Sequence, residues 1–166
     1  MSVKDLEDYM MYQYSNVNDS NISLHDCRAE KMNFENGILS FEFPDGFWVT
    51  DKHPVNKSDN IVRTDTSKVQ YEIIDNEIDG IRIYIFKQTK LNKIIREEWE
   101  PENFISAVNN GDFKVEFITQ YKSFRSILHK CWVWFDKAPY HFECEIILET
   151  ENVKYNWNRL RYDSVW

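Results

Sequence analysis

The last third of the chain alternates apolar and polar side chains with a period of two. Residues 115–121 and 142–157 follow this pattern, and the apolar run 124–135 lies between them. In the last run, the first alternating apolar residues are Phe142, Cys144, Ile146 and Leu148. Successive side chains of a β-strand point to opposite faces, whereas a helix repeats every 3.6 residues. The pattern therefore predicts consecutive strands joined by short links, as in an antiparallel meander.

A β-hairpin is predicted nearer the N-terminus, where Asn36 and Gly37 separate two strand-like runs. This dipeptide tolerates the positive φ angles that a tight hairpin turn requires. Leu39, Phe41 and Phe43 alternate with polar residues directly after it. We expect this hairpin to begin the sheet.

Two helices are predicted, one over residues 3–14 and one near residues 100–110. The second has Pro101 at its start, glutamates around it and Gly111 beyond its end. Residues 69–75 and 80–87 are predicted to pair as strands, residues 91–99 fit either a strand or a helix, and residues 51–68 resemble a long loop. The expected fold is one α+β domain over residues 1–166, mainly antiparallel sheet of about seven to nine strands, as a meander, a curved sheet or a sandwich.

The formal net charge of −8 argues against nucleic acid and anionic membranes as partners, because phosphate groups repel an acidic surface. A basic protein is the expected partner. The sequence has neither a signal-peptide pattern nor 18 consecutive apolar residues, so neither secretion nor a membrane-spanning helix is expected. The three widely spaced cysteines are typical of reduced thiols, and we expect a cytoplasmic protein.

His25, Asp26 and Cys27 are the obvious candidates for nucleophilic catalysis, because a thiol needs a base and the base an orienting acid. Strand alternation would point Asp26 away from its two neighbours, so Cys27 is interpreted as a core residue. A zinc site at His129, Cys131 and Cys144 would lack the closely spaced ligand pairs of such sites. We assign no catalytic residue, metal or cofactor, and no motif supports an enzyme.

The best candidates for a binding surface lie on the predicted strands of the last third. Glu143, Glu145 and Glu149 share one strand face and suit a basic partner. Trp132, Trp134 and Tyr140 are aromatic residues that would line a ligand pocket if they did not fill the core.

The segment Leu24-His25-Asp26-Cys27-Arg28-Ala29-Glu30, followed by residues 37–43, resembles the start of several small, uncharacterised bacterial β-rich families. Some of these families are similar to immunity proteins of polymorphic toxin systems. The resemblance implies a cytoplasmic protein that masks a toxin by binding it, without catalysis.

Three functions therefore remain open on the sequence. The leading hypothesis is a protein-interaction module, an immunity protein that binds and neutralises a basic toxin. The alternatives are a small-ligand-binding domain with an aromatic-lined pocket, and a thiol or hydrolytic enzyme.

Overall fold

The computed structural model describes residues 12–166 and is built mainly from antiparallel β-strands. The predicted helix over residues 3–14 falls almost entirely outside the described part, and Tyr14 already belongs to the first strand. The predicted helix near residues 100–110 is confirmed as α2 (Pro101–Asn109), with proline in its first turn. Fourteen strands occur in the described part, more than the predicted seven to nine. Several have only two to four residues, too few for alternation to be visible in the sequence.

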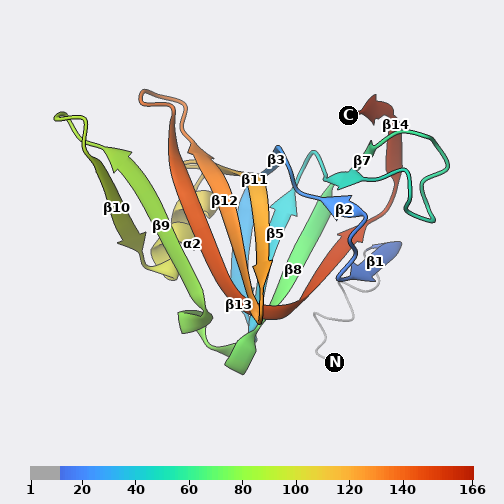
Figure 1. Ribbon diagram of the computed structural model, residues 1–166, viewed down its shortest axis with the longest axis horizontal. Coiled ribbons are helices and arrows are strands. Elements are labelled where there is room, and N and C mark those ends of the chain that lie inside the picture. Colours follow the sequence, from blue (N-terminus) through green and yellow to red (C-terminus); the bar gives the residue numbers. More distant parts are fainter. Residues whose placement is uncertain (1–11) are drawn as a thin grey trace.

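The long strand β13 (His141–Trp157) connects two layers of the largest sheet. Its first half pairs with β12 (Ser126–Trp134) on one edge and with β9 (Ile81–Gln88) on the other. Its second half pairs with β1 (Tyr14–Val17) and β8 (Ser67–Ile73), after a register shift between Thr150 and Asn152. Figure 1 shows β13 descending and then turning toward β1. The irregularity bends the strand, so the two halves belong to different layers.

The first layer has the strand order β3–β11–β12–β13–β9–β10 and the second the order β1–β13–β8–β5–β4. The other strands of these layers are β3 (Cys27–Ala29), β11 (Lys114–Ser123), β10 (Ile94–Trp99), β5 (Ile38–Phe43) and β4 (Lys31–Glu35). Phe41 and Phe43 of β5 contact Phe117 of β11, with ring centroids 5.1 and 5.4 Å apart. The core therefore lies between the two layers.

The predicted hairpin is confirmed by β4 and β5, which pair in register around Asn36 and Gly37. Both residues have positive φ, 52° and 76°, as a type I′ turn requires. The predicted pairing of residues 69–75 with 80–87 is wrong. Two short 3₁₀ turns, η1 (Ile74–Asn76) and η2 (Ile78–Gly80), separate β8 from β9, and each of these strands pairs with β13 instead.

Helix α2 covers the core where it contacts β4 of one layer and β9 of the other. Phe104 is fully buried on its inner face, 5.1 Å from the ring of Phe113. The side chain of Asn109 exchanges two hydrogen bonds with the backbone of Met32 on β4. These contacts hold the helix across both layers.

A small sheet packs beside the second layer in the order β14–β7–β6–β2. Its strands are β14 (Leu160–Val165), β7 (Val62–Thr64), β6 (Trp48–Val49) and β2 (Ile22–Ser23). The predicted loop over residues 51–68 therefore contains β7 and the start of β8. The rest is organised by the buried Asn56, whose Nδ2 lies within hydrogen-bond distance of three carbonyl oxygens.

Candidate functional site

The outer face of the first layer, turned away from the core, carries half-buried aromatic rings among charged side chains. Strand register places one row of residues side by side across six strands. The row consists of Arg28, Glu116, Trp132, Glu143, Phe86 and Arg96. Trp132 and Phe86 are partly exposed and Glu143 is exposed. We call this row, with the adjoining residues Lys130, Glu145, Tyr84 and Trp134, the outer-face cluster.

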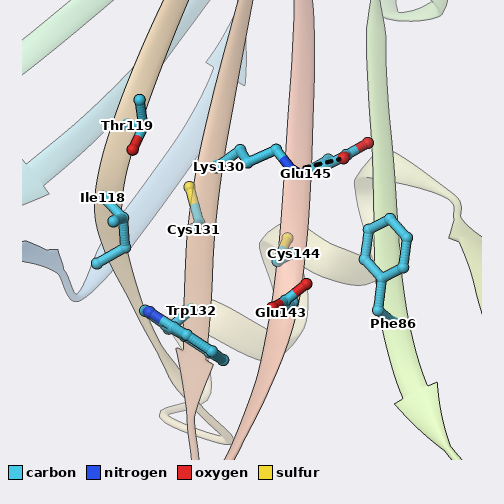
Figure 2. Close-up of a pocket in the computed structure, with 9 residues that line it drawn as sticks. All are labelled: Phe86, Ile118, Thr119, Lys130, Cys131, Trp132, Glu143, Cys144 and Glu145. Atoms are coloured by element: carbon cyan, nitrogen blue, oxygen red, sulfur yellow. Dashed lines mark ion pairs between the residues drawn. The ribbon is translucent and has the colours of Figure 1, made fainter. Parts of the chain in front are cut away.

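A depression of about 160 Å³ lies in the outer-face cluster, and its lining is completed by Ile118, Thr119, Cys131 and Cys144. Figure 2 shows Trp132 and Glu143 beside each other on neighbouring strands, with Phe86 on the next strand and Lys130 and Glu145 above them. The rings of Phe86 and Trp132 thus lie among charged side chains in the lining of this depression, a combination typical of protein-binding surfaces.

Charges of both signs meet on this face. Glu145 lies 3.5 Å from the guanidinium of Arg96 and 3.7 Å from Nζ of Lys130. Its charge is thus offset by two cations. The described residues provide no ion pair for Glu143, so its carboxylate remains available to a partner.

Cations also lie on the aromatic rings. The guanidinium of Arg96 lies 3.5 Å from the ring centroid of Tyr84, and that of Arg28 lies 4.8 Å from Trp134. Trp134 is also 4.9 Å from the ring of His141. Contacts of this kind restrain the long side chains and keep the face preorganised.

The structure brings three of the six predicted binding residues together, Trp132, Glu143 and Glu145. Trp134 lies next along β12 on the same face, and Glu149 is exposed on that face farther along β13. The sixth, Tyr140, belongs to the tight turn between β12 and β13 and is 58% exposed. It therefore adjoins the cluster without lining the depression.

Sequence reasoning missed Phe86, Arg96 and Lys130. The alternation in residues 81–88 does place Tyr84 and Phe86 on one face, but it does not say which strand lies next to β9. Only the pairing of β9 with β13 puts Phe86 opposite Glu143.

The sequence predicts that the Asp26 side chain points away from both His25 and Cys27. For His25 this prediction is wrong. His25 and Asp26 precede β3, and Asp26 has a φ of 56°, so strand alternation does not apply. The His25 Nε2 lies 3.4 Å from the Asp26 carboxylate. Cys27 is nevertheless buried, and burial raises the pKa of its thiol to about 11 even though Arg63 lies 3.6 Å from the sulfur. A thiol that stays protonated at neutral pH is a poor nucleophile.

Cys131 and Cys144 are directly opposite each other on β12 and β13, a register that the sequence left open. Both are buried, and burial raises the pKa of each thiol well above its ordinary value. Within residues 12–166 no group of three histidine, cysteine or acidic side chains has the arrangement of a metal site.

Comparison of the chain with protein-family models, curated protein sequences and solved structures gives no match. In the described part of the chain, no helix has the length and apolar character needed to cross a membrane.

Proposed function

We propose that this chain is a protein-interaction module that binds a basic protein through the outer-face cluster, as an immunity protein masks a toxin. The observation that supports the proposal is the row Trp132–Glu143–Phe86 on a sheet face that α2 leaves uncovered. Tryptophan is enriched among the residues that dominate binding energy at protein interfaces. A carboxylate without an ion pair beside it would select a cation of the partner.

The net charge of −8 adds a long-range attraction toward a basic partner. Such steering speeds association and is screened by salt. The complex is therefore expected to form faster at low ionic strength, whereas its lifetime depends on the rings of the outer-face cluster.

The first test takes the product of the gene adjacent to the one that encodes this chain. The two proteins are produced together, and affinity is measured by calorimetry at low and high salt. A stoichiometric complex that weakens as salt rises would support the proposal. The absence of a complex with a basic neighbour, even at low ionic strength, would remove most of its support.

The second test compares two charge reversals in that complex, Glu143→Lys and Asp59→Lys. Both change the net charge equally, but Asp59 is exposed in the loop before β7 and lies outside the outer-face cluster. We expect the Glu143 variant to bind much more weakly than the Asp59 variant. Trp132→Ala should weaken binding by roughly 30-fold, which corresponds to a loss of about 2 kcal/mol of binding free energy. Equal affinities for all three variants would show that binding occurs elsewhere.

A further inference from the structure

A cleft of about 690 Å³ opens between the layers. It shares Ile118 and Thr119 with the depression of the outer-face cluster, but none of the ten residues of that cluster lines it. One wall is β11 from Phe117 to Lys122, and the other is formed by residues 19–25. Trp166 lies at the rim, where its ring is 5.3 Å from that of His25. The inner-face residues His129 and Tyr155 also line the cleft, so it reaches into the core.

The wall formed by β11 includes an unpaired strand edge. β11 pairs with β3 only as far as Phe117, whose carbonyl accepts a 2.8 Å hydrogen bond from the amide of Asp26. The next carbonyl, that of Ile118, accepts a 2.5 Å hydrogen bond from Nδ1 of His25. Both carbonyls face this edge because the register of β11 shifts, as in a β-bulge, between Phe117 and Thr119. From Ile118 onward, the backbone groups of successive strand residues point alternately to the two edges. Those of Gln120 and Lys122 therefore face the cleft, where the described residues give them no strand partner.

The inner end of the cleft offers one specific polar contact. His129 is 1% exposed and its Nε2 is 2.8 Å from the hydroxyl of Tyr71. Burial lowers its pKa to about 3, so the imidazole is neutral at pH 7 and has one donor and one acceptor. Tyr71 uses one of them, and no hydrogen bond to Nδ1 is found among the described residues. Apolar and aromatic side chains surround the ring, with Phe117 at 4.9 Å.

We propose that this cleft binds an extended peptide segment of a protein as an additional strand on residues 119–123 of β11, with a tyrosine side chain reaching His129. An exposed strand edge is a common template for peptide binding, in which main-chain hydrogen bonds supply affinity and pockets supply specificity. Gln120 is directly opposite His129 in the register. A residue added beside Gln120 would lie two strand spacings, roughly 10 Å, from His129. Only a long side chain spans that distance, and the free imidazole nitrogen favours one that ends in a hydroxyl group.

The experiment selects a random library of phage-displayed heptapeptides on the full-length chain and measures the affinity of the enriched peptides. We expect these peptides to alternate β-formers around one tyrosine. Gln120→Pro removes the backbone N–H that faces the cleft and should weaken binding by about tenfold or more, whereas Gln120→Ala retains that N–H and should bind as the wild type does. Circular dichroism checks that the proline variant folds, and hydrogen exchange of the wild type tests whether bound peptide protects the Gln120 and Lys122 amides.

The tyrosine contact has its own test. Replacing the peptide's tyrosine by phenylalanine should weaken binding by about tenfold to the wild type and have no effect with the Tyr71→Phe/His129→Leu variant. The proposal is overturned if no peptide is enriched, if enriched peptides bind the Gln120→Pro variant normally, or if the two amides stay unprotected. It is also wrong if p-cresol alone competes as well as the peptide, because the cleft would then be a small-molecule site. Glu143→Lys should leave peptide binding unchanged, so this proposal and the proposed function can fail separately.

Discussion

The buried imidazole of His129 makes the stability of this protein depend on pH between about 6.5 and 3. Burial lowers the pKa of this side chain from 6.5 to about 3 in the folded state. As pH falls below 6.5, the unfolded chain takes up a proton that the folded protein excludes. The contribution of the neutral His129 side chain to the free energy of unfolding is therefore fully present above pH 6.5 and is lost progressively as pH falls toward 3.

The size of this effect follows from the two pKa values. Each pH unit below 6.5 lowers the free energy of unfolding by about 1.4 kcal/mol, so the loss reaches about 2 kcal/mol at pH 5. This is a large part of the free energy of unfolding of an ordinary domain, about 5–15 kcal/mol. The loss should therefore be measurable well before general acid denaturation.

The assay is urea unfolding at pH 7 and pH 5, followed by tryptophan fluorescence, for the wild type and for Tyr71→Phe/His129→Leu. The double variant removes the imidazole together with the hydroxyl that bonds it, so no buried polar partner is left unpaired. All other histidines and carboxylates are common to both proteins and largely cancel. From pH 7 to pH 5, we expect the free energy of unfolding to fall by about 2 kcal/mol more in the wild type than in the variant. Equal losses in the two proteins would show that His129 does not cause the pH dependence.

Three further predictions concern the thiols, one turn and one loop. All three cysteines are buried, and burial raises the pKa of the Cys27 thiol to about 11. Ellman's reagent at pH 8 should therefore label the three thiols only after denaturation, and rapid labelling of the native protein would contradict this. Gly37→Ala should destabilise the protein more than Gly111→Ala in thermal melts, by roughly 1–3 kcal/mol, because both glycines have positive φ but only at Gly37 would the new Cβ clash with a neighbouring side chain, that of Asn76. Equal losses of stability in the two variants would disprove the clash. Asn56→Ala should lower the free energy of unfolding by about 2–3 kcal/mol and speed proteolysis within residues 50–61, because it removes the hydrogen bonds of the Asn56 amide to the loop backbone. An unchanged cleavage rate would show that this side chain does not organise the loop.

Local patterns were sufficient for several elements of the fold. Alternation and turn chemistry correctly predicted the hairpin around Asn36 and Gly37, because that turn depends on the φ angles of two adjacent residues. The proline at the start of α2 and the glycine beyond its end likewise act within a few residues of the helix ends. The shortest strands escaped prediction because they are formed by pairing with distant segments.

The candidate site was predictable only in part, for a related reason. The faces of Glu143, Glu145 and Trp132 follow from alternation along single strands, but the residues beside them come from other strands. The pairing of β8 with β9 was a reasonable expectation from their proximity in sequence. Each pairs with β13 instead, which places Phe86 beside Glu143.

Composition and neighbours within a few residues were enough to set the secondary-structure class, the main hairpin turn, the helix after Trp99 and the acidic net charge. The bend in β13, the layer to which each strand belongs, and the burial of His129 beside the cleft all depend on the packed structure. The same holds for the edge of β11, which has no strand partner beyond Phe117 among the described residues. These features arise from hydrogen bonds and packing between residues far apart in the chain, and local periodicity carries no information about which distant strands will meet.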